Sequence, residues 1–486
     1  MTKPAKLYLE TSGCPKNQAD SRQIRGMLAE AGYAFAEEPQ DAAVIILNTC
    51  GFVDDAKEES IQAILRLSQW KQEGACCRLV VIGCLVQKYG AELAEAIPEA
   101  DMFLGVANWE DLLAYITSQM QELPGGARLT QTETSQAQTD AAPTHAESES
   151  GQALRLIAHA PTGRQDVDLY RPEWAAQSGE EPAGYVKIAE GCSHHCTFCV
   201  IPQIRGPYRS RALDAIVDEV RVRVAQGLKE AILVAQDTGA YGRDLAPASS
   251  LAELLGALAA IDGLAWIRIM YCYPEEVDEA LIEAMRHPKV CPYLDMPIQH
   301  IDDQVLKGMG RPLSSARLQA TIAMLRKGIP HIAIRTTLMV GFPGETEAAF
   351  DSLMAFLDEY PLERVGFFAF SPQPDTPAER LPGQIPQDVK DKRLALATAK
   401  RDALLAQWQD AMVGKVVSVM IDEAAGSENA GYYDYEGRTA WDAPEIDGLV
   451  SFSDTTLYAP GQIVHLRITH SRDYILSGEI THEPSQ

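Results

Sequence analysis

Apolar runs alternate with amphipathic stretches through the first 121 residues. The runs KLYLETSG, AAVIILNTC and RLVVIGC have the length and composition of buried strands. After the first run, Ile24, Met27, Leu28 and Ala31 recur at intervals of three and four residues, which places them on one face of a helix. Alternation of this kind is typical of an α/β fold with a parallel sheet, so residues 1–122 are predicted to form an N-terminal α/β domain.

The pattern dissolves between residues 123 and 180. The segment TQTETSQAQTDAAPTHAESESGQ is polar, acidic and rich in Thr, Ser, Gln and Ala, a composition that cannot bury a core. We predict a flexible acidic linker over 123–180, within which the assignment of the stretch YRPEW is open.

Strand and helix patterns resume from 181 to 410. The six strand candidates are YVKIAEG, AILVAQD, WIRIMYCYP, YLDMPIQ, IAIRTTLMVGFPGE and RVGFFAFSP. Because a closed barrel of this type needs eight strands, six predict an open, partial (β/α)6 barrel. Residues 413–482 alternate like strands with turn signals between them, which predicts a small all-β barrel. The expected fold class is therefore α/β, with a parallel-sheet domain, a partial barrel and a C-terminal β-barrel.

Three cysteines lie within eight residues in the stretch GCSHHCTFCV, directly after the first strand of the partial barrel. Cys192, Cys196 and Cys199 are compatible with a structural zinc, an iron–sulfur cluster with one open iron, or a disulfide with a spare thiol. Structural zinc usually takes four closed ligands, and His194 or His195 would have to supply the fourth from the same tight loop. Cubane clusters take thiolates, so the spacing favours the open cluster.

A second set of cysteines falls at the ends of the first three predicted strands. Cys14, Cys50 and Cys84 stand there beside the turn glycines Gly13, Gly51 and Gly83. In open α/β sheets ligands gather outside the carboxyl ends of the strands, so these thiols are expected to meet at one edge. Each alone is compatible with a core thiol, but the shared placement favours a common site. Cys76, Cys77, Cys272 and Cys291 have no such placement and are expected to be structural.

The net charge and the number of cysteines restrict the possible partners of the chain and the possible chemistry of its cysteines. The chain has 42 Lys and Arg residues against 68 Asp and Glu residues, a net charge of −26. Such a chain repels phosphate, so a basic protein suits it better as a partner than a nucleic acid. The beginning of the chain lacks an apolar segment and no run reaches the length of a membrane span, so we expect a cytoplasmic protein without membrane contact. In a reducing compartment a disulfide is the weakest option for the ten cysteines.

Several motifs together resemble one known enzyme family. The pattern C-x-x-x-C-x-aromatic-C after the first barrel strand resembles the radical S-adenosylmethionine (SAM) superfamily, as does MVGFPGETE at 339–347, which resembles its glycine-rich segment along the adenine. The stretches TSGCPKNQADS, LNTCGFVDDAKEES and VVIGCLVQKYG resemble the N-terminal domain of the methylthiotransferase family, and the C-terminal barrel resembles its TRAM domain. The resemblance covers nearly the whole chain apart from the linker, whose length departs from the family pattern.

The resemblance implies a radical transferase with SAM and two 4Fe-4S clusters as cofactors. The cluster on Cys192, Cys196 and Cys199 would chelate SAM and release a 5′-deoxyadenosyl radical, which takes hydrogen from a substrate C–H bond. The cluster on Cys14, Cys50 and Cys84 would deliver sulfur, and a second SAM would donate the methyl group. The protein itself would position the reacting groups and exclude water from them. An electron donor such as flavodoxin or ferredoxin is implied as a partner.

The same resemblance assigns SAM contacts residue by residue. Phe198 would shield the cluster and contact the adenine, unless it is a core aromatic. Gln236 and Asp237 stand where the superfamily places a motif for the methionine amine, and Gly341 and Gly344 belong to the glycine-rich segment. Arg335 would pair with the SAM carboxylate, unless it forms a buried structural ion pair.

The substrate prediction depends on the C-terminal barrel. The family divides between tRNA adenosine modifiers and the RimO type, which methylthiolates the β-carbon of an aspartate in ribosomal protein S-twelve of the small subunit. Residues 413–486 carry four basic and twelve acidic side chains, a net charge of −8 that repels RNA and suits a basic protein. The segments GRTAWDAPEIDG and DMPIQHIDDQVLKGMGR also resemble the RimO type.

We therefore predict that Asp442, Glu445 and Asp447 lie on a surface that meets the ribosomal protein. Three alternatives stay open from the sequence. The acidic charge is also compatible with a merely solubilising surface, the same chemistry is compatible with a tRNA adenosine, and the cysteine loop is compatible with a structural zinc scaffold.

Overall fold

The computed structural model describes residues 5–122, 156–157, 170–177, 181–426 and 431–483. Its chain divides into two compact units. Unit 1 comprises Met1–Gly179, Glu190–Ser193 and Val200–Tyr208, and unit 2 comprises Glu180–Ala189, His194–Cys199 and Arg209–Gln486. Among the described residues, no helix combines the length and apolar character needed to cross a membrane.

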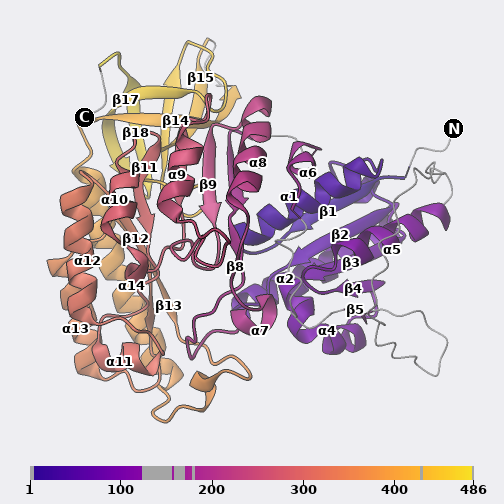
Figure 1. Ribbon diagram of the computed structural model, residues 1–486, viewed down its shortest axis with the longest axis horizontal. Coiled ribbons are helices and arrows are strands. Elements are labelled where there is room, and N and C mark those ends of the chain that lie inside the picture. Colours follow the sequence, from indigo (N-terminus) through magenta and orange to yellow (C-terminus); the bar gives the residue numbers. More distant parts are fainter. Residues whose placement is uncertain (1–4, 123–155, 158–169, 178–180, 427–430, 484–486) are drawn as a thin grey trace. The chain divides into compact units, whose positions relative to one another are not determined.

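The core of unit 1 is a parallel sheet with its strands in sequential order (Figure 1). The strands are β1 (Leu7–Thr11), β2 (Val44–Thr49), β3 (Arg78–Gly83), β4 (Met102–Leu104) and β5 (Leu156–Ile157). The helices are α1 (Pro15–Glu30), α2 (Asp54–Ser68), α3 (Trp70–Glu73), α4 (Cys84–Ala96), α5 (Trp109–Glu122) and α6 (Pro172–Gln177). The predicted N-terminal parallel α/β fold is confirmed.

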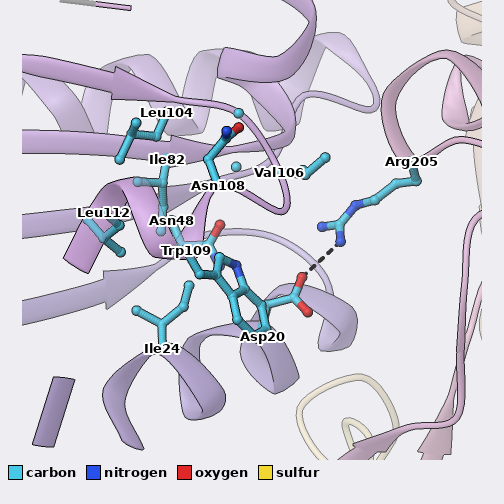
Figure 2. A pocket seen from close by; sticks show the side chains of 12 residues that line it. Asp20, Ile24, Asn48, Ile82, Leu104, Val106, Asn108, Trp109, Leu112 and Arg205 are labelled. Atoms are coloured by element: carbon cyan, nitrogen blue, oxygen red, sulfur yellow. Dashed lines mark hydrogen bonds and ion pairs between the residues drawn. The ribbon is translucent and has the colours of Figure 1, made fainter. Parts of the chain in front are cut away.

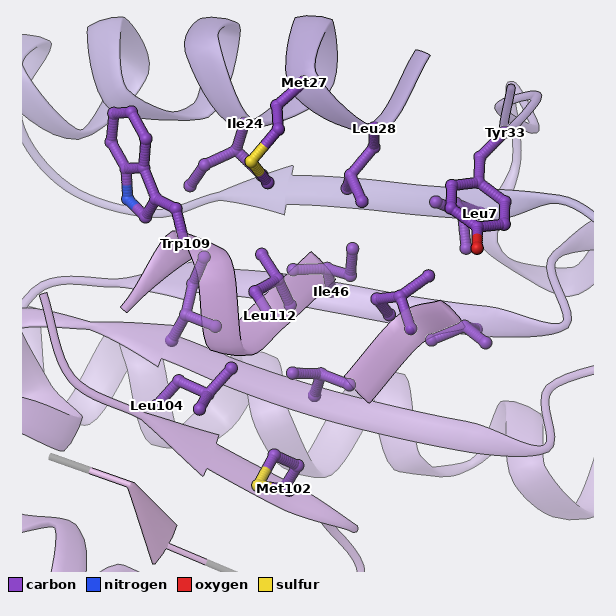
Figure 3. Close-up of a cluster of buried hydrophobic side chains, with 14 of the residues drawn as sticks. Leu7, Ile24, Met27, Leu28, Tyr33, Ile46, Met102, Leu104, Trp109 and Leu112 are labelled. Atoms are coloured by element: carbon purple, nitrogen blue, oxygen red, sulfur yellow. The ribbon is translucent and has the colours of Figure 1, made fainter. Parts of the chain in front are cut away.

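Both faces of this sheet are covered, which explains why its strands are apolar throughout. All six residues of β2 are buried. Val44 and Ile46 pack with α1 and α5 on one face, as Figure 3 shows for Ile46. Ile45 and Leu47 pack with α2 and α4 on the opposite face. Successive side chains of a strand point to opposite faces, so a run without polar alternation requires two apolar layers.

Part of the predicted linker is structured. Within 123–180, Leu156–Ile157 forms β5 beside β4, and α6 lies against α1. The hydroxyl of buried Tyr170 donates a hydrogen bond to Asp20 Oδ1 at 2.7 Å. A Cβ atom on Gly26 would overlap the backbone of Trp174, so glycine permits the close approach of α1 and α6. The stretch YRPEW is therefore not linker, because its aromatic residues have a core to bury against. The remaining residues of the predicted linker lie outside the described ones.

Unit 2 contains the predicted open (β/α)6 arrangement. Its parallel sheet has the order β13-β12-β11-β10-β9-β6, in which β6 and β13 form the two edges. The strands are β6 (Ala183–Lys187), β9 (Glu230–Val234), β10 (Trp266–Ile269), β11 (Val290–Asp295), β12 (Ala333–Val340) and β13 (Arg364–Ala369). The helices are α8 (Leu213–Gln226), α9 (Leu251–Ala259), α10 (Glu279–Met285), α11 (Asp303–Gly308), α12 (Ser315–Gly328), α13 (Glu347–Glu359) and α14 (Gln387–Asp410). Two short strands, β7 (Ala189–Glu190) and β8 (Arg209–Ser210), and helix α7 (Ile201–Arg205) belong to the segment around the cysteine loop.

The last part of unit 2 is the predicted small barrel. It closes in the order β14-β15-β16-β18-β17. Its strands are β14 (Val416–Gly426), β15 (Tyr433–Thr439), β16 (Leu449–Asp454), β17 (Ile463–Arg472) and β18 (Ile475–Ile480). Its interior is filled by alternate residues of these strands, including Val419, Ile421, Tyr435, Phe452 and Leu466. Closure leaves no free sheet edge in this barrel.

A buried set of ionic and polar side chains joins the closed barrel to the six-stranded sheet. We call this set the inter-barrel cluster, and its members are Glu230, Arg268, Tyr293, Asp295, Arg335, Arg364, Arg438, Asp442 and Asp447. Glu230 and Arg364 are the first residues of β9 and β13, so the closed barrel covers the amino ends of the parallel strands. The carboxyl ends stay available for the loops that carry the predicted chemistry.

Candidate functional site

The three N-terminal cysteines lie at the carboxyl ends of adjacent strands, as the sequence predicted. Cys14 is the N-cap residue of α1, Cys50 follows β2 directly, and Cys84 begins α4 after β3. All three are free thiols. Gly13 has φ +94°, and a Cβ atom on it would overlap the side chain of Cys50. Glycine is therefore required at this position for the two cysteine-bearing loops to come together.

The electrostatics of these thiols favour a metal site. Burial raises the pKa of Cys84 to about 12, and the Arg205 guanidinium opposes that rise. Burial, followed by the influence of Cys14, raises the pKa of Cys50. Cys50 and Cys14 also raise the pKa of Cys84. Thiolates are the ligands of iron–sulfur clusters. Three free thiols at one sheet edge, of which Cys50 and Cys84 are buried, therefore fit a cluster whose positive charge favours the thiolate form.

Asparagines hold the backbone beneath these cysteines. Asn17 Nδ2 donates to the carbonyls of Ser12 at 3.1 Å and of Thr49 at 3.0 Å, which joins the loops after β1 and β2. Asn48 Nδ2 donates to the carbonyl of Asn17 at 3.1 Å and to Ser21 Oγ at 3.0 Å. Sequence reasoning missed both asparagines. Their position inside the cysteine motifs CPKNQADS and LNTC was the signal that would have found them.

A small cavity adjoins this site in unit 1. Asp20, Asn48, Gly83, Trp109 and Arg205 are among its lining residues. Figure 2 shows Asp20 and Arg205 pointing toward each other, and their ion pair measures 2.8 Å. Arg205 was also missed, because nothing in the local pattern around IPQIRG indicates which group it meets.

The second cysteine set lies on the loop that follows β6 and β7. Cys192 belongs to unit 1, where its backbone N–H donates to Gly206 O at 3.1 Å. Cys196 and Cys199 belong to unit 2, where the N–H of Cys199 donates to Cys196 O at 3.1 Å. None of these three described cysteines forms a disulfide, and Cys192 and Cys196 are buried.

His194 does not stand free as a fourth metal ligand in this loop. Its Nε2 lies 2.8 Å from Asp237 Oδ2, and its ring stacks on Tyr273 with 4.2 Å between the ring centroids. Asp237 follows β9, is fully buried, and accepts a second hydrogen bond from Gly239 N at 3.1 Å. Asp237 therefore orients the middle of the cysteine loop, and neighbouring Gln236 is partly buried beside it.

Arg311 is a further residue at this edge that the sequence did not single out. Burial raises the pKa of the Cys196 thiol, while the charge and hydrogen bond of Arg311 oppose this rise. The Arg311 guanidinium lies over the ring of Tyr273, 4.1 Å from its centroid, and donates to Pro297 O at 3.1 Å. The side chain therefore places a fixed positive charge beside a predicted cluster ligand. Arg311 is the last residue of the segment DMPIQHIDDQVLKGMGR.

The glycine-rich segment after β12 has the backbone that its sequence demands. Gly341 has φ +73° and Gly344 φ +85°, conformations that favour glycine. A Cβ atom on Gly341 would overlap Lys390, whereas the space beside Gly344 is open to 4 Å. Glu345 accepts a hydrogen bond from the N–H of Gly341 and pairs with Arg393 at 3.0 Å, which fixes the turn. Phe198 packs against the neighbouring apolar cluster that contains Phe342 and Phe370.

Arg335 lies within β12, beside the last residue of β11, Asp295. It is the third residue of β12, five residues before Val340, which separates it from the carboxyl end by about 16 Å of extended chain. Its guanidinium pairs with Asp295 at 2.8 Å and with Asp447 at 3.7 Å. The structural ion pair that the sequence left open is therefore present. Pairing of Arg335 with a SAM carboxylate stays a prediction.

Two of the three carboxylates expected to face the substrate are buried. The side chain of Asp442 is 2% exposed and pairs with Arg364, and that of Asp447 is 3% exposed and accepts a hydrogen bond from Tyr293. Both belong to the inter-barrel cluster, so neither lies on a docking surface. Glu445 alone is exposed. The turn between β15 and β16 is acidic because it meets arginines of the sheet.

Comparison with known proteins supports the assignment of each part. Residues 6–105 match the uncharacterized protein family UPF0004, residues 186–357 the radical SAM superfamily, and residues 413–481 the TRAM domain. A ribosomal protein uS12 methylthiotransferase RimO of Anaeromyxobacter sp. (strain K) is 41% identical over 99% of this chain and 94% of its own length. Its counterpart in Desulforudis audaxviator is 39% identical over 98% of this chain and 97% of its own length.

The chain belongs to the RimO family of radical SAM methylthiotransferases. It is therefore a transferase, with SAM and iron–sulfur clusters as its cofactors. The radical SAM methyltransferase TsrM of Kitasatospora setae has a similar fold, with a TM-score of 0.52 and 14% identity over 77% of this chain and 74% of that one. At that identity the likeness concerns the fold alone.

Proposed function

We propose that this RimO-family enzyme transfers a methylthio group to the β-carbon of an aspartate in ribosomal protein uS12. The observation that carries the proposal is identity of about two residues in five along nearly the entire chain to proteins named for that activity. The two separate sets of three cysteines support it, because the reaction needs both C–H activation and a sulfur source.

Each cysteine set has its own role in this proposal. Cys192, Cys196 and Cys199 hold the cluster that binds SAM, and Cys14, Cys50 and Cys84 hold the auxiliary cluster. When bound, the SAM-binding cluster supplies the chemistry for hydrogen abstraction, and the auxiliary cluster supplies sulfur. A small redox protein such as flavodoxin or ferredoxin serves as the electron donor in the cytoplasm.

The chain's own side chains position and shield these groups. Asp237 holds His194 and thereby the middle of the cysteine loop. Glu345 holds the turn that begins at Gly341, and the open space beside Gly344 accommodates a ligand against the backbone. Arg311 places its guanidinium beside Cys196. These groups lie on loops after the carboxyl ends of β6, β9, β11 and β12, where the chemistry of such sheets gathers.

Charge on the closed barrel supports a basic protein substrate. Glu423, Asp434 and Glu436 are exposed and line one groove, and we call these three residues the acidic strip. Glu423 and Glu436 are direct partners on β14 and β15. Like charges directly opposite each other on neighbouring strands are destabilising, and a cationic partner relieves that repulsion. The docking surface is therefore assigned to the acidic strip, since Asp442 and Asp447 are buried.

The deciding experiment is an anaerobic reaction with reconstituted enzyme, SAM and a reductant. Purified uS12 and bulk tRNA are supplied in parallel and analysed by mass spectrometry. The proposal expects the mass of a methylthio group on one aspartate of uS12 and no change in tRNA. Modified adenosine in the tRNA arm, with unmodified uS12, contradicts the substrate assignment. Zinc in place of iron in the purified chain contradicts the enzymatic role altogether.

A further inference from the structure

Arg205 connects the auxiliary cysteine site to the loop that carries Cys192. It ends α7, six residues after Cys199, and residues 200–208 and 190–193 belong to the same compact unit as the N-terminal sheet. Its guanidinium is buried and donates hydrogen bonds to several side chains of unit 1. Nε donates to Cys84 Sγ at 3.2 Å, Nη2 to Asn17 Oδ1 at 2.7 Å, and Nη1 to Asp20 Oδ2 at 2.8 Å and Glu190 Oε2 at 2.9 Å.

The charges around this guanidinium are arranged asymmetrically. Asp20 and Glu190 pair with its Nη1, both buried, so the two carboxylates take up one end of the fork. The Nε–H at the other end is directed at the sulfur of Cys84. The hydrogen bond from Nε–H to the thiol is additional to the two ion pairs, and joining the two carboxylates does not require it. Hydrogen bonds from charged donors are about twice as strong as neutral ones, so this contact is a substantial interaction once the sulfur carries negative charge.

Glu190 extends the connection toward the second cysteine set. Its Oε1 accepts a hydrogen bond from the N–H of Gly191 at 3.0 Å, directly before Cys192. A Cβ atom on Gly191 would overlap the backbone carbonyl of Pro207, so the chain is tightly constrained here. A continuous hydrogen-bonded path therefore runs from Cys84 through Arg205 and Glu190 to the backbone beside Cys192.

We propose that Arg205 sets the reduction potential of the auxiliary cluster through its Nε–H···Sγ hydrogen bond to Cys84. The inference rests on the proposed assignment of Cys14, Cys50 and Cys84 as the ligands of that cluster. Hydrogen bonds to ligand sulfurs and nearby positive charge stabilise the reduced, more negative form of an iron–sulfur cluster, which raises its potential. Arg205 is thus a positioning residue that acts through a ligand.

The inference predicts the direction in which each substitution shifts the reduction potential, and a purely structural role of Arg205 does not. Removing the guanidinium removes a donor and a positive charge and leaves two negative charges near the cluster, so the potential falls. Removing the charge of Asp20 leaves the guanidinium less compensated, so the potential rises. A residue that only held the fold together would produce no opposed pair of shifts.

The experiment uses the full chain with Cys192, Cys196 and Cys199 replaced by Ala, so that the auxiliary cluster alone remains. Midpoint potentials are measured by redox titration monitored by electron paramagnetic resonance. Arg205→Gln is expected to make the midpoint potential more negative. The ratio of reduced to oxidised cluster at a fixed potential should fall about tenfold, which corresponds to a shift of about 59 mV for a one-electron couple. Arg205→Lys keeps the charge without the fork and should shift it less, and Asp20→Asn should shift it positive.

Arg223→Gln is the matched control. Arg223 is a fully buried arginine of unit 2 that lies 3.4 Å from Glu219, and Glu219 keeps its pair with Arg211 at 2.7 Å. Its loss should leave the midpoint unchanged.

The outcomes separate the inference from the assignment on which it rests. Absence of iron in the background variant overturns the ligand assignment. Full iron with unchanged midpoints in Arg205→Gln and Asp20→Asn overturns the inference alone. If Arg205→Gln fails to retain iron, the direction of the shift in Asp20→Asn decides, because that variant keeps the guanidinium: a positive shift supports the inference and an unchanged midpoint overturns it.

Discussion

The hydroxyl of Tyr293 in β11 donates a hydrogen bond to the carboxylate of Asp447, 154 positions later in the chain, at 2.8 Å. Arg335 and Arg364 flank the same carboxylate at 3.7 and 4.0 Å. The closed barrel is therefore attached to the sheet through buried charges, and its orientation on the amino ends of the strands is specified by them.

Loss of Arg364 is expected to destabilise this attachment. Arg364 pairs with Asp442 and lies over the ring of Trp408, 4.1 Å from its centroid. Arg364→Ala leaves a buried carboxylate without its cation, which costs about 3–5 kcal/mol. Chemical denaturation followed by tryptophan fluorescence should show an earlier transition. The exposed Asp262→Asn serves as the control and should change stability by less than about 0.5 kcal/mol. Coincident transitions for Arg364→Ala and the unmodified chain would contradict this account.

The stability of unit 2 should depend on the protonation of Asp447. Burial raises the pKa of this carboxyl above its ordinary 3.8, against the influence of Arg335 and Arg364. A raised folded-state pKa contributes stability that is complete below pH 3.8 and is lost as pH rises through the folded value. The unmodified chain should therefore lose stability relative to Asp447→Asn across that interval. Unfolding free energies of both chains at a series of pH values test this, and a difference that does not vary with pH would refute it.

The two cysteine sets are expected to hold iron independently. Replacing Cys192, Cys196 and Cys199 by Ala should halve the iron of anaerobically reconstituted protein and abolish SAM cleavage. Replacing Cys14, Cys50 and Cys84 should also halve the iron but spare reductive cleavage to 5′-deoxyadenosine. Cys76→Ala, a buried cysteine outside both sets, should keep all iron. Loss of cleavage in both triple variants, with iron retained at the other set, would argue against separate roles.

The acidic strip should control the rate of substrate association. Each exposed charge contributes on the order of 1 kcal/mol or less, so the three residues are replaced together as Glu423→Gln, Asp434→Asn and Glu436→Gln. The methylthiolation rate of uS12 should fall at low salt, and the defect should shrink as salt rises, because screening at 0.15 M limits such fields to about 8 Å. A matched triple variant at exposed Glu92, Glu95 and Glu99 removes the same charge from unit 1. Equal salt dependence in the two triple variants would reject docking at the strip.

The two glycines after β12 should differ in their tolerance of alanine. Both have positive φ, which costs a side chain about 1–2 kcal/mol. The methyl group of Gly344→Ala meets open space, so the free energy of unfolding should fall by only that amount. Gly341→Ala also forces Lys390 to move, and the Lys390 amine donates to Phe370 O at 2.8 Å. Denaturation midpoints of the two variants should therefore differ, with Gly341→Ala the less stable, and equal midpoints would show that Lys390 relocates freely.

The sequence by itself determined the strands and where the cysteines fall on them. Buried parallel strands are recognisable from continuous apolar runs, and the carboxyl ends of neighbouring parallel strands share one edge. Cys14, Cys50 and Cys84 could therefore be assigned to one site from their positions alone. The same reasoning placed Gly341 and Gly344 after a strand of the partial barrel.

Only the tertiary structure decided which charged groups are exposed and which are paired. The acidic turn around Asp442 and Asp447 has the composition of a surface, yet its partners Arg364 and Arg335 lie 78 or more positions earlier on strands of another barrel. Arg205 likewise meets Cys84 across 121 positions. Apolar periodicity is a local property because the backbone repeats it every two or 3.6 residues. The partner of a charge has no such repeat, and it is set by the way distant segments pack.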